Sequence, residues 1–281
     1  SGYALTDNQR MKLAAIEAMW HTEEAPAGLS IFGIPDMEAQ ETRFEVKVPY
    51  VLGLISTRSL TGEVMGINEL VLKADERIRS GIVAYDAVEK LKVHRTDMAA
   101  REQFERHKAD LGYAMLLKRH VADPRSATDQ QILLAAKDTI PNVPVMFWLF
   151  RIMAGLGFFF IGFFALAFYC ASACKFSKPW FLKIAVAIIP LPWIAIEFGW
   201  MLAEIGRQPW AVEGVLPTFL AASSLTVGQI WTTIIGFTLL YGTLAVIEVR
   251  LMIATIRKGP VEHHEPEMSR GSAGYAPLPA E

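Results

Sequence analysis

Three long apolar segments constrain the fold of this chain more than any other feature of its sequence. Residues 152–174 and 214–247 contain no charged side chain, and residues 181–205 contain only three. A helix that crosses a bilayer needs about 20 mostly apolar residues, so each segment is long enough to span. We therefore predict an all-α integral membrane protein with three transmembrane helices. The predicted helices cover about residues 145–174, 181–205 and 224–249.

Most of the charge lies outside these segments, and residues 1–143 are predicted to form a separate, mostly helical domain. Proline and glycine recur in residues 25–65, which are predicted to be loop with short extended pieces, including a brief strand over residues 44–48. A Thr128-x-x-Gln131 capping box predicts the start of a short helix. The other helices of this domain are expected over about Asp7–Trp20, from Asn68 onward and over about Thr96–Lys118.

Basic residues predict the orientation of the chain in the membrane. Lys175, Lys178 and Lys183 lie in or near the first connection, and more basic residues follow the third segment. The positive-inside rule places both regions in the cytoplasm and residues 1–143 in the periplasm. Residues 259–281 have the composition of a flexible cytoplasmic tail. The net charge of −2 argues against a dedicated nucleic-acid-binding protein.

Polar side chains within or next to the predicted spans are the candidate functional residues. A carboxylate at bilayer depth costs about 2.5–3.5 kcal/mol on insertion scales, so Glu197 is expected to meet a metal centre, a proton path or a cation. Met153 lies two residues after Arg151 and could serve as an axial haem ligand, with the cation near the propionates. Arg207 and Gln208 offer several hydrogen-bond donors at the end of the second span. These residues favour redox or transport chemistry.

Five short motifs, in order along nearly the whole chain, resemble subunit I of the cytochrome bd-type ubiquinol oxidases. They are K-L-A-A-I-E (12–17), F-G-I-P-D (32–36), F-R-I-M (150–153), P-L-P-W-I-A-I-E (190–197) and G-R-Q-P-W (206–210). Any one of them alone would be a weak signal. Together they imply a terminal respiratory oxidase that passes electrons from ubiquinol to oxygen and generates a proton motive force without pumping protons.

The resemblance also implies a role for each candidate residue. Lys12 and Glu17 match the quinol-oxidation residues, and residues 1–143 match the quinol-binding loop. Met153 matches an axial ligand of the low-spin haem b iron, supported by Arg151. Glu197 matches the carboxylate at the high-spin haem b iron, close to haem d and to Trp193. Arg207 and Gln208 are expected to position haem propionates or the quinol loop.

The same resemblance covers only the second half of the family's subunit. No histidine lies in the three predicted spans, whereas the family's missing half carries histidine ligands for the low-spin haem b and for haem d. The expected partners are therefore that N-terminal half, subunit II, a small single-span subunit and the lipid of a bacterial inner membrane. A nicked or split subunit is the favoured account.

Two other classes of protein remain open at the level of the sequence. A membrane receptor or sensor would use residues 1–143 to bind a ligand. Half of a transporter would use Glu197 as a coupling carboxylate, with Pro190 and Pro192 breaking the second span. Neither alternative requires haem, so haem bound to the purified protein would exclude both.

Overall fold

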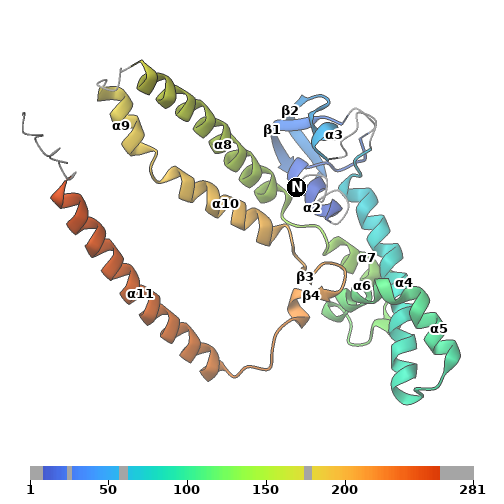
Figure 1. The fold of residues 1–281 in the computed structure, drawn as a ribbon. Coiled ribbons are helices and arrows are strands. Elements are labelled where there is room, and N and C mark those ends of the chain that lie inside the picture. Colours follow the sequence, from blue (N-terminus) through green and yellow to red (C-terminus); the bar gives the residue numbers. More distant parts are fainter. Residues whose placement is uncertain (1–8, 24–26, 57–62, 174–178, 260–281) are drawn as a thin grey trace, which may run out of the picture. The chain divides into compact units, whose positions relative to one another are not determined.

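A computed structural model describes residues 9–23, 27–56, 63–173 and 179–259 (Figure 1). Three helical segments among them are long and apolar enough to cross a membrane. These segments and the high helix content confirm the predicted helical membrane fold. Residues 1–222 and 223–281 form two compact units, which are described separately. The predicted tail from residue 260 onward, Lys175 and Lys178 lie outside the described residues.

The first unit begins with a helical region that contains one long helix and several short ones. The long helix α4 packs against α5, α6 and α7, and the short helix α2 contacts both α4 and α8. Thr128 and Gln131 form the predicted capping box at the start of α7. The α-helices are α2 (Arg10–Glu17), α3 (Val51–Ser56), α4 (Ile67–Val93), α5 (Met98–His107), α6 (Leu111–Leu116) and α7 (Asp129–Lys137). Three 3-10 turns join them: η1 (Lys108–Asp110), η2 (Leu117–Arg119) and η3 (Pro124–Ser126).

The helix predicted over Thr96–Lys118 is not continuous. It is interrupted by η1, where Arg77 of α4 donates hydrogen bonds to the Asp110 carboxylate at 2.6 Å and to the Ala109 carbonyl at 3.4 Å. At Gly81 of α4 the Asp110 carbonyl comes so close that a Cβ would lie 2.2 Å from it. Contacts with α4 therefore determine where this helix is interrupted, and local helix propensity does not indicate that position.

The segment predicted as loop over residues 25–65 contains an antiparallel hairpin, which corrects that prediction. Its strands are β1 (Leu29–Asp36) and β2 (Glu41–Val48). The register shifts between Ser30 and Ile34, and Phe44 has a positive φ of 51°. These irregularities interrupt the alternation of apolar and polar residues that normally marks a strand.

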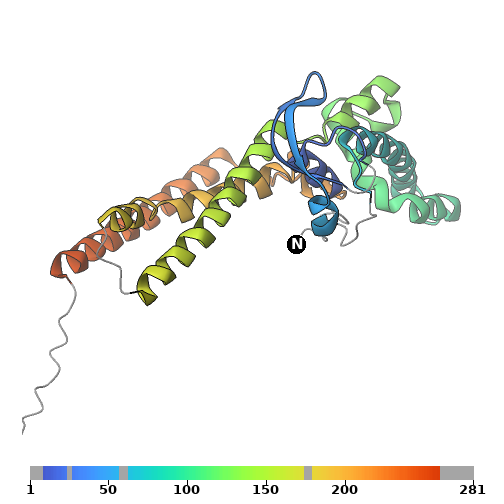
Figure 2. The same cartoon turned by 90° about the horizontal axis from the view of Figure 1, so that it is seen from above.

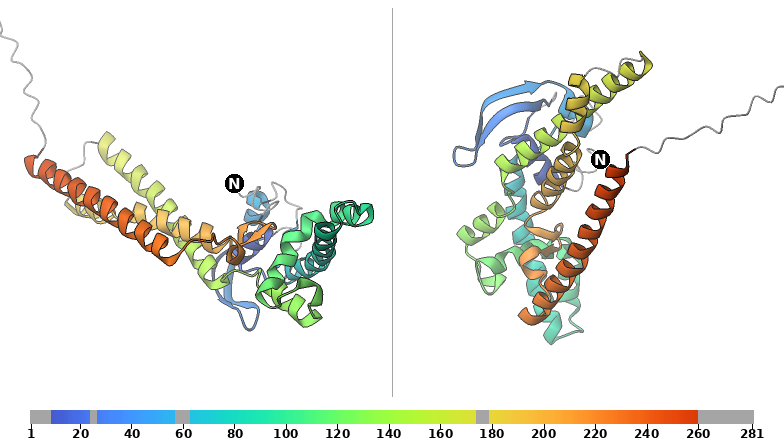
Figure 3. Two further views of the ribbon diagram at one scale, coloured as in Figure 1. Left: turned by 90° about the horizontal axis from the view of Figure 1, so that it is seen from below. Right: turned by 90° about the vertical axis from the view of Figure 1, so that its left-hand side faces the viewer.

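Two membrane-spanning segments complete the first unit. Helix α8 (Val143–Ser172) begins at Asn142, whose side chain accepts a hydrogen bond from the Val145 amide. The second segment consists of α9 (Pro179–Ala187) and α10 (Leu191–Ile205), separated by a turn before Pro190. Helices α8 and α10 pack against each other, and Figures 2 and 3 show the two from other directions.

A short irregular segment follows α10. It contains the paired strands β3 (Trp210–Val212) and β4 (Leu216–Pro217) and the 3-10 turn η4 (Thr218–Leu220). The second unit consists of α11 (Val227–Lys258), which starts at a capping box of Thr226 and Gln229. Helix α11 begins near the predicted residue and continues further than the predicted end at 249.

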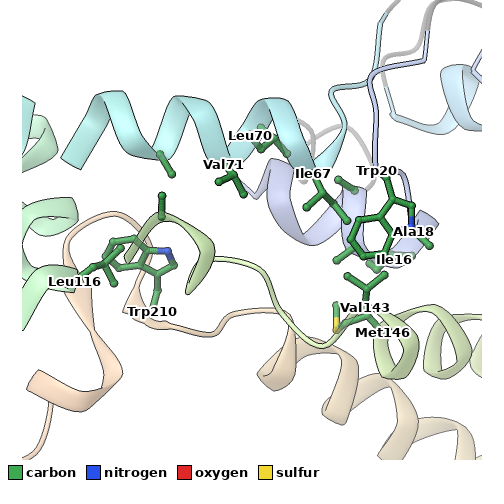
Figure 4. Packing of buried hydrophobic residues seen from close by; sticks show 14 of the residues in the cluster. Ile16, Ala18, Trp20, Ile67, Leu70, Val71, Leu116, Val143, Met146 and Trp210 are labelled. Carbon is green, nitrogen blue, oxygen red and sulfur yellow. The ribbon is translucent and has the colours of Figure 1, made fainter. Parts of the chain in front are cut away.

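The main apolar core joins the outer region to the start of α8 (Figure 4). Ile16 and Trp20 lie with Ile67 of α4 and with Val143 and Met146 of α8. The same cluster extends to Leu116 of α6 and to Trp210 of β3. Buried apolar area is the dominant stabilising term in such a cluster, so α2 is held between α4 and α8.

Candidate functional site

A buried ion pair links the short helix α2 to the membrane-spanning helix α8. Glu17, at the end of α2, is only 1% exposed, and its Oε2 lies 3.2 Å from Nη2 of Arg151 on α8. Arg151 also donates to the carbonyls of Ile16 at 2.8 Å and of Phe147 at 3.0 Å, and to the carbonyl of Ser30. The guanidinium therefore holds α2, β1 and α8 together.

The protonation of Glu17 is sensitive to this environment. Burial raises the pKa of the Glu17 carboxyl from its usual 4.5 to about 7, although Arg151 and the Ser30 amide both lower it. The Ser30 amide donates to the carboxylate at 3.2 Å. A buried carboxyl group with a pKa near neutrality can change its charge under physiological conditions.

Met153 lies where α8 and α10 meet. Its side chain is half-buried, and a Cβ added to Gly199 of α10 would lie 3.1 Å from the Met153 sulfur. The missing side chain at Gly199 therefore allows the Met153 thioether to pack closely against the backbone of α10. Arg151 lies two residues earlier on α8, within the same turn but about 200° around the helix from Met153.

Glu197 and Trp193 occupy a different face of α10. They are four residues apart, so they lie one above the other on the helix, and both are exposed in this chain. Glu197 precedes Gly199 by two residues, which is about 200° around a helix. The structure therefore separates the Glu197 face from the Met153 face.

Lys12 lines a cavity of about 380 Å³, which is within the usual range of about 300–1,000 Å³ for small-molecule sites. The cavity lies between α2, α4, α6 and the segment after α10. Lys12 is half-buried, and its Nζ donates to the Ala203 carbonyl at 3.4 Å. Burial lowers the pKa of the Lys12 ammonium, while Glu204 and Glu213 raise it. Glu17 does not line this cavity, because five residues place it about 140° around α2 from Lys12.

Arg77, Tyr113 and Glu213 also line the cavity, and the charges of Glu213 and Lys12 act on each other. Arg77 donates to the Tyr113 hydroxyl at 3.1 Å, and its guanidinium lies 4.1 Å from the centre of the Tyr113 ring. The Tyr113 ring in turn contacts Trp210 at a centroid distance of 4.9 Å. Burial raises the pKa of the Tyr113 phenol, so this group is a neutral donor near pH 7.

Of the two residues predicted at the end of the second span, only Gln208 reaches the cavity. Gln208 is a lining residue, and its side-chain oxygen accepts a hydrogen bond from the Thr218 hydroxyl at 2.9 Å. Arg207 is exposed and pairs with Glu204. The two neighbours therefore have different surroundings.

Sequence reasoning missed several residues of these two sites. Ser30 is a buried partner of both Glu17 and Arg151, yet it lies in a segment predicted as loop. Tyr113 and Glu213 belong to no motif, and only the fold brings them to Lys12. The one available signal was that Glu213 follows the G-R-Q-P-W motif by three residues.

Comparison with known proteins identifies the family. The sequence matches the family described as cytochrome bd terminal oxidase subunit I over residues 1–260. This chain belongs to that family. It is 35% identical to the cytochrome bd-II ubiquinol oxidase subunit 1 of Escherichia coli (strain K12), over 96% of this chain and 53% of the relative. It is 27% identical to the cytochrome bd ubiquinol oxidase subunit 1 of Bacillus subtilis (strain 168), over 94% of this chain and 46% of the relative. The chain thus spans about half the length of these curated relatives.

The residues present fit part of a haem site. The Met153 thioether is a suitable axial ligand, and Arg151 Nε is buried without a hydrogen-bond partner among the described residues. The described ranges contain no cluster of three His, Cys, Asp or Glu side chains that could hold a metal ion. An iron bound by Met153 would therefore need its second axial ligand from elsewhere.

Proposed function

We propose that this chain is the quinol-binding half of a cytochrome bd-type oxidase subunit I, which passes electrons from ubiquinol through haem to oxygen. The named relatives are subunits of ubiquinol oxidases. Protons released by quinol oxidation leave on the outer side, and protons for water formation come from the inner side. This arrangement generates a proton motive force without a pump.

One observation carries the proposal. The Glu17–Arg151 pair connects the outer region, where the quinol would bind, to the turn of α8 that precedes Met153. A quinol oxidase needs its electron donor close to its first acceptor, and this pair joins the two sites within one packed region. A receptor or a transporter would have no need for the Met153 thioether at this position.

Within the proposed site, Lys12 and Glu17 have different tasks. Lys12 lines the cavity and donates a hydrogen bond to a quinol oxygen, for which a cation is well suited. Glu17 does not reach the cavity, and it serves quinol oxidation by fixing Arg151 relative to the outer helices. Gln208 lines the same cavity, whereas the exposed Arg207, which pairs with Glu204, would hold a haem propionate at the surface of the segment.

The proposed cofactors are two haems b and one haem d, which supply the redox chemistry when bound. Met153 would ligate the low-spin haem b iron, with Arg151 beside it. Glu197 would ligate the high-spin haem b iron, with Trp193 on the same face of α10. The second ligands would come from the N-terminal half of the subunit. Subunit II and a small single-span subunit would complete the assembly in the bacterial inner membrane.

Substitution of the proposed ligand tests this function in the intact oxidase. We expect Met153→Leu to remove the low-spin haem b absorbance and to lower ubiquinol-dependent oxygen uptake at least tenfold, because leucine cannot ligate iron. Met252→Leu, at an exposed methionine of α11, is the matched control and should leave the spectrum unchanged. The measurements are the reduced-minus-oxidised absorbance spectrum of the native oxidase, the pyridine haemochrome spectrum for total haem b, and oxygen consumption.

Two results would contradict the proposal. A purified oxidase without haem would exclude the function itself. An unchanged low-spin spectrum in Met153→Leu would exclude Met153 as the ligand while leaving the function intact.

A further inference from the structure

We infer that Glu213 is the carboxylate that accepts a proton from the quinol bound at Lys12. This inference rests on the proposed function, because it assumes that the cavity binds a quinol. It assigns a catalytic task to a residue outside all five motifs of the family resemblance.

The composition of the cavity wall is the first argument. Four basic residues line the cavity, namely Arg10, Lys12, Lys73 and Arg77. Among the described residues of the wall, Glu213 is the one carboxylate. Quinol oxidation requires a proton acceptor within hydrogen-bond reach of a hydroxyl group, and an ammonium or guanidinium group cannot serve. Glu213 is therefore the acceptor that the described wall provides.

The position of Glu17 is the second argument. Its carboxylate is buried against Arg151 and the Ser30 amide, and it lies on another side of α2 from Lys12. A quinol held by Lys12 in the cavity would not touch it. A separate acceptor is needed on the wall that faces Lys12.

The surroundings of Glu213 suit the task. Partial burial of its carboxyl raises the pKa of Glu213, while Arg77 and Lys12 lower it. Tyr113 is the remaining titratable group of the facing wall, and its phenol stays neutral. An acceptor works best when its pKa is close to the working pH, so a raised value is favourable. The residue as a whole remains exposed, so an accepted proton can pass to solvent.

The fold keeps Glu213 in place although it lies in a short irregular segment. It lies between β3 and β4, next to Gly214, whose φ of 68° makes the turn possible. A Cβ on Gly112 of α6 would lie 2.2 Å from the Gly214 carbonyl, so the two backbones are in close contact. Trp210 is buried against Tyr113 at the start of the same segment. These contacts hold the short segment that carries Glu213, and Glu213 lines the cavity from this segment.

The proposed step is the two-electron, two-proton oxidation of a quinol. Oxidation of one quinol to a quinone breaks two O–H bonds and releases two electrons and two protons. Lys12 donates a hydrogen bond to a quinol oxygen, and Glu213 accepts the proton of one hydroxyl group and returns it to solvent. The proton of the other hydroxyl leaves to bulk water. The electrons go to the oxidase haems and finally to oxygen.

The test compares three forms of the intact oxidase: wild type, Glu213→Gln and Glu102→Gln. We expect Glu213→Gln to lower kcat with ubiquinol about 100-fold and to remove the loss of rate at acid pH, since general-base catalysis contributes roughly 10²–10⁴-fold. Glu102→Gln removes an exposed carboxylate of α5 that does not line the cavity, so it should keep the wild-type kcat and pH profile. Haem content and oxygen uptake with tetramethyl-p-phenylenediamine, an electron donor that carries no transferable proton, should be equal in all three.

The outcomes distinguish a failure of the Glu213 assignment from a failure of the proposed oxidase function. Wild-type kcat and pH profile in Glu213→Gln would overturn the inference, and the oxidase function would stand. An oxidase without haem or quinol-dependent oxygen uptake would overturn both. If Glu213→Gln does not assemble, infrared difference spectra of quinol oxidation compare wild type with Glu213→Asp. A shifted carboxyl band supports Glu213 as the acceptor, and identical spectra overturn it.

Discussion

At the scale of single residues, Arg151 determines how the outer region and the membrane helices meet. Its guanidinium bonds Glu17, Ser30, Ile16 and Phe147, which come from α2, β1 and α8. Removing one partner of a buried ion pair costs about 3–5 kcal/mol, because the other charge is left without compensation. Lysine could not replace this arginine, since it lacks the planar fork of donors.

Glu17 predicts a pH dependence of stability. Its pKa is raised in the folded protein to about 7 from 4.5, so between these values the folded state keeps a proton that the unfolded state releases. The contribution of Glu17 is therefore fully present below about pH 4.5 and is lost as the pH rises to 7. At 1.36 kcal/mol per pKa unit this loss is at most about 3 kcal/mol.

Glu17→Gln should remove this slope. The measurement is the thermal midpoint of the intact oxidase at pH 5 and pH 7, compared between wild type and the variant. Glu102→Gln, at an exposed carboxylate of α5, is the control and should keep the wild-type difference. Equal differences in wild type and Glu17→Gln would contradict the raised pKa.

At the scale of elements, the contact between α2 and the end of α10 positions Lys12. Gly206 follows α10 immediately, and a Cβ there would lie 2.5 Å from Met146 Cε and 2.9 Å from Lys12 Cε. The absence of a side chain at Gly206 therefore allows the lysine to pass beside the G-R-Q-P-W motif. This contact explains physically why a glycine precedes Arg207.

Gly206→Ala should displace Lys12 and weaken binding of the quinol. We expect the KM for ubiquinol to rise about tenfold, which corresponds to about 1.4 kcal/mol, with a smaller change in kcat. Gly228→Ala in the first turn of α11 is the matched control, because a Cβ there meets nothing within 4 Å in this chain. A KM equal to that of the wild type would show that Lys12 does not bind the quinol.

The same elements show which parts of the fold the sequence could predict. Hydropathy located the spanning helices, and the capping box located α7, because both signals are local. The hairpin was missed because its bulges and the positive φ of Phe44 interrupt the alternation of apolar and polar residues. The helix break before α6 was missed because contacts with Arg77 and Gly81 of α4 determine its position. The family resemblance singled out Lys12 and Glu17, and their spacing of five residues already placed them on different sides of a helix. It could not reveal that Glu17 is buried against Arg151 while Lys12 lines a cavity. Glu213 reaches the cavity only through contacts between distant segments.

At the scale of the whole molecule, orientation in the membrane is the main open prediction. Residues 1–143 are predicted on the periplasmic side and the C-terminus in the cytoplasm, since basic residues gather at the opposite ends of the spans. A quinol site built on Lys12 would then release protons outward, as the proposed function requires.

Cysteine labelling in intact cells tests this orientation. Glu102→Cys on α5 should react with a membrane-impermeant maleimide, whereas Lys258→Cys at the end of α11 should react only after the inner membrane is permeabilised. The unsubstituted protein measures the background from Cys170, which is buried, and Cys174. The reverse pattern of labelling would invert the topology and place proton release on the wrong side.

The Glu17–Arg151 pair has a consequence for biogenesis. Glu17 leaves the ribosome long before Arg151, so the carboxylate has no partner while more than a hundred intervening residues are made and, in the predicted topology, exported. Until α2 docks against α8, Arg151 lies at the edge of the bilayer and no carboxylate compensates its positive charge. Insertion of the first span is thus coupled to docking of the helices that precede it. If export of those helices were delayed, Arg151 on α8 would lack its carboxylate partner, and quality-control proteases could recognise the incompletely folded protein.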